Sequence, residues 1–245
     1  MSILEVKNIV KKNDKGTVLK DVSFNIDEKG IYAILGKKAS GKVELAQVLA
    51  GCSDIDGGEV VYREVSMYSN AKNNKIVKTK IGYVPENISF FPDMTVYEIL
   101  DFVGKLRGVD TDKRVRQIKE ALEIVELSNK YEVFIKELTL SERKRLSLAH
   151  ALIGNPSLII LEEPTGQISL NDAELIKNLI VMLGDKKIVI LITDKTNLVQ
   201  DIAKNVGIMS NGKMTLWESV DNLKSRFEGD DNFLIKAFVS FSSEN

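Results

Sequence analysis

The segment from Gly36 to Val43 has the residue types and the spacing to bind a phosphate group. It reads GKKASGKV, which fits the pattern G-x-x-x-x-G-K of a phosphate-binding loop. In such a loop the backbone N–H groups surround the phosphates at the start of a helix, and the lysine, here Lys42, reaches the outer oxygens. The alternative is a surface turn rich in glycine and lysine. The residues predicted to bind phosphate are Gly36, Lys37, Lys38, Ala39, Ser40, Gly41, Lys42, Val43 and Glu44.

Position 43 departs from this pattern, which requires Ser or Thr after the lysine. That hydroxyl normally binds Mg²⁺ beside the phosphates, and a valine side chain has no oxygen to offer. The loop is therefore predicted to hold phosphate with part of its metal site missing. Two readings of Lys37 and Lys38 stay open: they partly replace the charge of the metal, or they are solvated surface lysines.

The segments around the loop alternate between strand and helix patterns. Residues 31–35 form an apolar strand-like run before the loop, and residues 44–50 are compatible with a helix after it. Alternating strands and helices in the last third indicate a parallel-sheet α/β core, and Thr95 with Glu98 forms a capping box at the start of a middle helix. The other predicted strands are 4–10, 18–26, 59–62, 81–84, 158–161, 188–192, 206–209 and 214–217, and the other predicted helices are 95–107, 112–127, 139–153, 170–183 and 198–204.

Composition excludes some classes of function. The 245 residues carry a formal net charge of −1, so nothing indicates a nucleic-acid binder. The N-terminus does not have the layout of a signal peptide, and the apolar runs are far shorter than the ~20 residues that span a bilayer. Any membrane role is therefore expected to involve another chain. The single cysteine, Cys52, is expected to be a buried small apolar residue in a reducing compartment.

Four motifs follow one another along the chain: the loop at 36–43, IGYVPE at 81–86, LTLSERKR at 138–145 and LIILEEPT at 158–165. In this order they resemble the nucleotide-binding subunit of an ABC transporter, of the exporter-type, single-domain kind, and the resemblance covers essentially the whole chain. It implies an α/β fold with an ABC-type P-loop NTPase core and a mixed, largely parallel sheet. It also implies an N-terminal antiparallel β part and a helical insert at about 89–155, within one domain of residues 1–245.

The resemblance also assigns roles to single residues. Glu163 stands where the family places the carboxylate that polarises the attacking water, and Glu86 and Glu162 stand at weak metal-binding positions. Because three carboxylates would cluster there, we expect one of them to titrate at raised pH unless a cation binds. The basic run Arg143-Lys144-Arg145 is expected to be a solvated helix face. The departures from the family motifs are Asn13 for an aromatic residue, Ala39 for a glycine, Val43, Glu86 for the usual Gln, Leu140, Ser141 and Glu142 in the signature, Glu162 for an Asp, Ser169 for an Asp, and Asp194 for the usual His.

Two functions from different classes follow. In the first, the chain is an ATP-binding subunit that couples to a separate membrane-spanning subunit and has weak or absent hydrolysis of its own, with Mg²⁺ uncertain. The second is a non-enzymatic scaffold or regulatory subunit that binds no nucleotide. A working ATPase with Glu86 and Glu162 on the metal is a third reading, so enzyme status stays open. The expected partners are the membrane subunit and a second, intact nucleotide-binding subunit, and not nucleic acid; the expected place is cytoplasmic, peripheral on the inner face of the cell membrane.

Overall fold

The computed structural model describes residues 2–14, 16–227 and 230–242, and it contains two β-sheets. The first sheet is antiparallel and four-stranded, in the order β2-β1-β4-β5. Its strands alternate between buried and exposed residues, because only one face packs on the core. The strands are β1 (Leu4–Asn13), β2 (Gly16–Ile26), β4 (Gly57–Tyr62) and β5 (Val65–Ser66).

The second sheet is six-stranded, in the order β10-β9-β3-β8-β7-β6. Five of its strands run parallel, and β10 pairs antiparallel with β9. The central strands are buried along their whole length, as expected for a parallel sheet covered on both faces. The strands are β3 (Gly30–Gly36), β6 (Ile81–Val84), β7 (Leu158–Glu162), β8 (Ile188–Thr193), β9 (Asn205–Ser210) and β10 (Lys213–Ser219).

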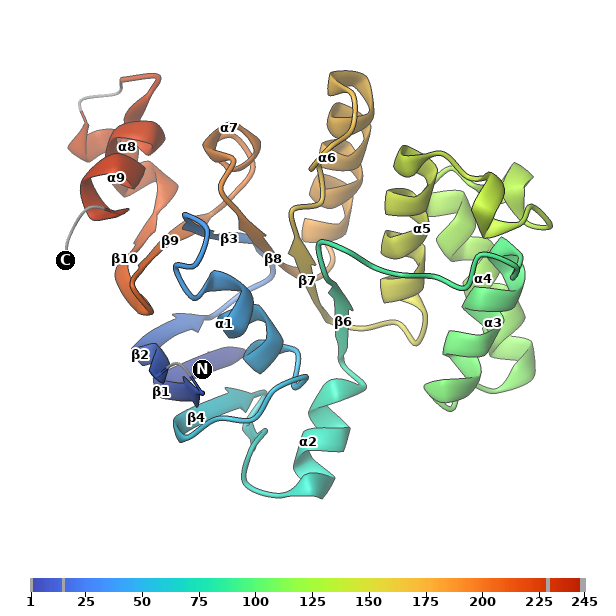
Figure 1. Ribbon diagram of the computed structural model, residues 1–245, viewed down its shortest axis with the longest axis horizontal. Helices are drawn as coiled ribbons and strands as arrows, with labels where there is room; N and C mark the ends of the chain where they lie inside the picture. The colour runs from blue at the N-terminus through green and yellow to red at the C-terminus, as the bar shows by residue number, and fades with distance from the viewer. Residues whose placement is uncertain (1, 15, 228–229, 243–245) are drawn as a thin grey trace.

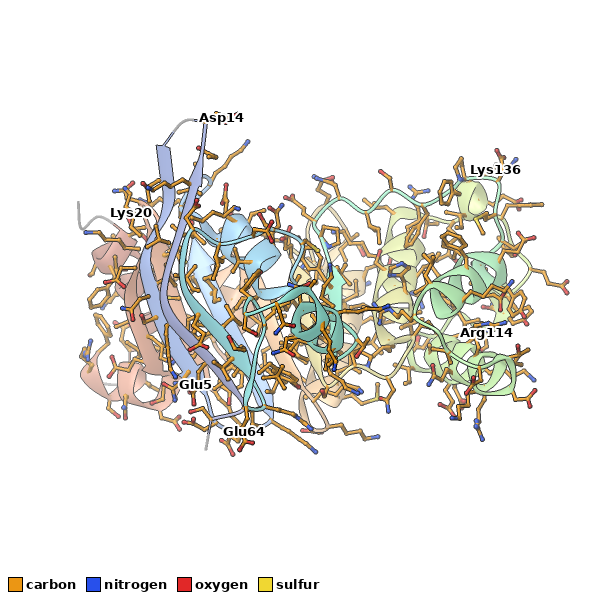
Figure 2. The ribbon with its side chains drawn as sticks, turned by 90° about the horizontal axis from the view of Figure 1, so that it is seen from below. Glu5, Asp14, Lys20, Glu64, Arg114 and Lys136 are labelled. Carbon is orange, nitrogen blue, oxygen red and sulfur yellow. The ribbon has the colours of Figure 1, made fainter. Side chains whose placement is uncertain are left out.

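Helix α1 (Lys42–Leu49) packs between the two sheets, and its apolar side chains share one core with both of them. The other face of the second sheet joins a larger core with the helices. Helices α3 (Val96–Leu106), α4 (Thr111–Ile124) and α5 (Leu140–Leu152) lie at the end of the molecule away from the first sheet (Figure 1). Arg114 and Lys136 mark this end, and Glu5 and Lys20 mark the other (Figure 2).

The remaining helices have the following bounds: α2 (Ala71–Lys78), α6 (Leu170–Gly184), α7 (Thr196–Val199), α8 (Val220–Arg226) and α9 (Phe233–Ser242). Two short 3₁₀ turns, Ser128–Lys130 and Ile135–Glu137, connect α4 to α5. In the described ranges, no helix combines the length and apolar character that crossing a membrane requires.

Most predicted elements agree with the structure, and the capping box of Thr95 and Glu98 is confirmed. The helix predicted at 198–204 is wrong in extent, since α7 is a single turn that ends at Val199. Sequence reasoning missed α2, whose mainly polar residues show no apolar period and whose N-terminus is capped by the side chain of Asn70. The expectation for Cys52 is also wrong, because this residue follows the end of α1 and is exposed.

Candidate functional site

The loop from Gly36 to Gly41 joins the end of the central strand β3 to the start of helix α1. A side chain at Gly36 would lie 2.2 Å from Ser40 Oγ, so only glycine allows the loop to close on itself. Gly41 has φ +94°, a backbone conformation that glycine adopts without strain. Ser40 is 5% exposed, and its Oγ has no hydrogen-bond partner among the described residues. A buried hydroxyl of this kind, at a helix N-terminus, is suited to an anion.

Lys42 is the first residue of α1 and is only 7% exposed. Its Nζ lies 2.9 Å from Glu163 Oε1, and both side chains are largely buried. The structure thus brings together the two residues to which the sequence assigned phosphate binding and catalysis. Each charge is compensated by the other, and removing one partner of a buried pair typically costs about 3–5 kcal/mol.

Glu163 directly follows strand β7 and makes further contacts that fix its carboxylate. Thr193 Oγ1 donates to Glu163 Oε2 at 2.8 Å, and the backbone N–H of Asp194 donates to Glu163 Oε1 at 3.1 Å. Thr193 is the last residue of β8, and Asp194 follows it. Because β8 is the parallel neighbour of β7, the carboxyl ends of the two strands meet here. Glu163 has φ +40°, which is uncommon for a residue with a side chain. Three hydrogen bonds, from Lys42, Thr193 and the main chain of Asp194, therefore hold this carboxylate.

Glu162, the last residue of β7, is 4% exposed. Tyr83 Oη donates to Glu162 Oε1 at 2.6 Å, and the backbone N–H of Glu86 donates to Glu162 Oε2 at 3.2 Å. Burial raises the pKa of Glu162, while these two hydrogen bonds act to lower it; the charge of Glu86 adds a smaller increase. Burial is thus the main cause of the raised pKa of Glu162, whereas the sequence-based expectation attributes a raised pKa to the clustering of carboxylates.

The carboxylate of Glu86 is exposed, so this residue reaches the site mainly through its main chain. Lys37 and Lys38 are exposed too, and Lys38 lines the cavity beside the loop whereas Lys37 does not. That cavity has a volume of about 480 Å³. It is lined by Lys38, Ala39, Ser40, Gly41, Lys42, Val43, Glu44, Glu86, Glu162, Glu163, Gly166, Gln167, Ile192, Asp194 and Lys195.

The signature segment, residues 138–142, forms the capped start of helix α5. Thr139 is the N-cap, and its hydroxyl accepts from the N–H of Glu142 at 3.2 Å. The Glu142 carboxylate accepts from the N–H of Thr139 at 2.8 Å and pairs with Lys130 at 3.0 Å. These contacts, with the Thr139 hydrogen bond as the largest cause, lower the pKa of Glu142. The segment is thus a capped helix start, and its own carboxylate lies at the positive end of the helix.

The basic run after the signature does not form a solvated face, so that expectation is wrong. Arg143 donates to the carbonyl of Leu138 at 2.6 Å. Arg145 donates to two main-chain carbonyl oxygens directly after helix α4. Lys144 Nζ donates to the carbonyl oxygen of Glu163 at 3.1 Å, which brings an ammonium group to the loop after β7. All three side chains are half-buried.

Sequence reasoning missed four residues at this site: Tyr83, Lys144, Thr193 and Lys195. A signal existed for Thr193, because it ends a strand that was expected to lie in the same parallel sheet as the strand before Glu163. Lys195 Nζ donates to the carbonyl oxygen of Thr165 at 2.7 Å, and this contact crosses 30 residues of sequence. No local pattern predicts such a contact.

The fold and the loop together define an α/β P-loop protein, and solved structures share this fold. One, described as the ATP-binding subunit of an ABC transporter, superposes with a TM-score of 0.86 and 18% identity over 99% of this chain and 100% of its own. Another is a dimeric ATP-binding cassette in a post-hydrolysis state, bound to ADP and Pi. It superposes with a TM-score of 0.80 and 23% identity over 89% of this chain and 98% of its own.

Sequence comparison then gives the family. The family model described as ABC transporter matches residues 19–166. The molybdate/tungstate import ATP-binding protein WtpC of Methanocaldococcus jannaschii is 32% identical over 98% of this chain and 77% of its own length. The linearmycin resistance ATP-binding protein LnrL of Bacillus subtilis (strain 168) is 28% identical over 93% of this chain and 73% of its own. The chain belongs to the ABC transporter family, as a homologue of its ATP-binding subunits.

Proposed function

We propose that this chain is a nucleotide-binding subunit that holds ATP at the loop from Gly36 to Glu44 and hydrolyses it weakly or not at all. The observation that carries the proposal is the closed loop with its buried, unpartnered Ser40 hydroxyl and its buried Lys42. Backbone N–H groups at the start of α1 and the Lys42 ammonium group would hold the phosphates. The ion pair of Lys42 with Glu163 has to open when a phosphate takes the lysine.

Weak hydrolysis is proposed because several groups that position phosphoryl transfer are replaced. Catalysis of this reaction rests on positioning and electrostatics, and removing one stabilising group costs about 10²–10³ in rate in other enzymes. Glu163 keeps the position of the catalytic carboxylate, while the hydroxyl, Gln and His positions carry Val43, Glu86 and Asp194. The signature segment contributes a capped helix start in which Glu142 adds negative charge.

The proposal extends to the assembly. We infer that residues 1–245 act as one nucleotide-binding domain, with residues 89–155 as its helical insert, and that it docks on a separate membrane-spanning subunit at the inner face of the cell membrane. Phe91, 60% exposed, meets Phe102, 41% exposed, edge to face at 6.4 Å, and this aromatic pair on the helical end suits such a contact. A second nucleotide-binding subunit with intact motifs would supply the missing groups. The exporter-type assignment remains a prediction, since the relatives are named for import and for resistance.

The scaffold reading keeps one specific argument in its favour. A lysine in a phosphate loop would serve no purpose in a pure scaffold, but here Lys42 and Glu163 satisfy each other inside the protein. The pair therefore has a structural use even if no nucleotide binds.

Calorimetric titration of the purified chain with ATP separates the two functions. We expect micromolar binding that Lys42→Ala abolishes. Because that variant leaves the Glu163 charge unpaired, the double variant Lys42→Ala/Glu163→Ala is the matched control, which removes both charges and avoids an unpaired buried carboxylate. Binding by the wild type but not by the folded double variant supports a nucleotide subunit. A wild type that does not bind at millimolar ATP supports the scaffold.

A further inference from the structure

The buried polar groups that line the phosphate site offer little to magnesium. Val43 has no oxygen for it, and the carboxylates of Glu162 and Glu163 already accept hydrogen bonds at both of their oxygens. Mg²⁺ requires near-octahedral oxygen coordination and takes one or two carboxylates besides phosphates and water. Within residues 2–14, 16–227 and 230–242, no group of three or more acidic, His or Cys side chains is arranged to hold a metal ion. Glu86 and Asp194 are the exposed acidic residues among those that line this cavity.

Ammonium groups occupy the surroundings instead. Lys144 reaches the carbonyl of Glu163 from helix α5, and Lys195 reaches the carbonyl of Thr165 from the other side, after strand β8. Both lysines therefore hold the same short loop, which follows the catalytic-position glutamate. Lys195 lines the phosphate cavity, and Lys144 lines a neighbouring cavity of about 240 Å³ that shares Glu86 and Glu162 with it.

The charges around Lys144 show that these groups form one electrostatic cluster. Burial lowers the pKa of Lys144, the charges of Glu86 and Glu163 raise it, and that of Lys195 lowers it further. The charge of Lys144 therefore interacts with the charges of Lys195 and of the two carboxylates. A divalent cation placed here would face their ammonium groups as well as Lys42, and like charges at such distances repel strongly where water is partly excluded.

We propose that this site takes a nucleoside triphosphate without a bound divalent cation, with Lys42, Lys144 and Lys195 supplying the positive charge near its outer phosphates. The inference rests on the proposed nucleotide binding and adds the ionic form of the ligand. In a site of this kind, the two lysines that contact the loop after β7 supply the positive charge that a metal ion would otherwise provide. Glu162, buried under Tyr83, serves to anchor the main chain of Glu86.

The test is calorimetric titration of the full chain with ATP, once in EDTA and once in excess Mg²⁺. We expect the dissociation constant in EDTA to stay within about threefold of that in Mg²⁺, or to be lower. A constant at least tenfold higher in EDTA would overturn this inference and leave nucleotide binding intact. An absence of binding in both solutions would overturn both proposals, so the two failures are distinguishable.

The variant Lys144→Gln sharpens the test, because the amide can still donate to the Glu163 carbonyl while the charge is lost. We expect its affinity for ATP in EDTA to fall roughly tenfold, because one positive charge beside the phosphate cavity is removed. Added Mg²⁺ should now strengthen binding, an effect that we do not expect for the wild type. The control is Lys136→Gln, at the helical end of the molecule (Figure 2), where Lys136 pairs with the exposed Asp93. An equal loss of affinity in both solutions would show that Lys144 only supports the fold, and would count against the proposal.

Discussion

The phosphate loop and the segment 138–142 satisfy their polar groups in different ways. In the loop, Gly36 and Gly41 allow the close turns, Ser40 is buried, and position 43 is a valine. The segment 138–142 contains no glycine and forms a capped helix start held by Glu142 and Lys130. One region thus stays shaped for a ligand, while the other satisfies its own polar groups. This contrast agrees with the proposal that the chain holds a nucleotide at its own loop.

The largest effect should come from breaking the loop. In Gly41→Ala the new Cβ would lie 3.0 Å from the carbonyl oxygen of Val18, at φ +94°. We expect a loss of at least about 2 kcal/mol in the free energy of unfolding, measured in urea, and of ATP binding with it. The control Gly108→Ala also has a positive φ, +68°, but open space around the new Cβ. Equal losses in the two variants would show that close packing of the loop contributes nothing.

A second prediction concerns the far end of helix α5, where His150 lies with its ring 5.9 Å from that of Phe90. Burial, with a smaller effect of the Arg107 charge, lowers the pKa of His150 from 6.5 to about 4. The unfolded chain therefore binds the proton more readily, so stability falls as the pH drops from about 7 towards 4. Relative to His150→Leu, the wild type should lose about 2 kcal/mol between pH 7.5 and pH 5. Parallel pH profiles of unfolding for the two proteins would contradict this.

The smallest effect is expected at the signature cap. Glu142→Ala removes one half of the capping box and the pair with Lys130, and should cost about 1 kcal/mol of stability. ATP affinity of the isolated chain should not change, because Glu142 does not line the phosphate cavity. Glu98→Ala, in the matching capping box of helix α3, is the control without a lysine partner. If Glu142→Ala weakened ATP binding while Glu98→Ala did not, the contrast between the two regions would fail.

The sequence predicted the sheet, the helical insert and the position of the loop, since these follow from apolar periodicity and from motifs of fixed spacing. It also placed Glu163 at the end of a strand. It did not predict that Lys42 and Glu163 pair, because 121 residues separate them and only the packing of α1 against β7 sets their distance. The contact of Lys144 was not predicted for a similar reason. Its basic neighbours indicate a solvent-exposed helix face, whereas its side chain donates a hydrogen bond to a carbonyl oxygen of another loop.

The packing of Trp217 gives the protein a natural optical reporter. This residue is the only tryptophan of the chain, and it lies in β10 with its ring 4.7 Å from that of Phe24 in β2 and 6.2 Å from that of Tyr32 in β3. It therefore sits at the joint where the antiparallel sheet meets the parallel one. Its fluorescence emission spectrum depends on this packing. Separation of the two sheets can therefore be followed by tryptophan fluorescence in the unmodified protein, without an attached dye.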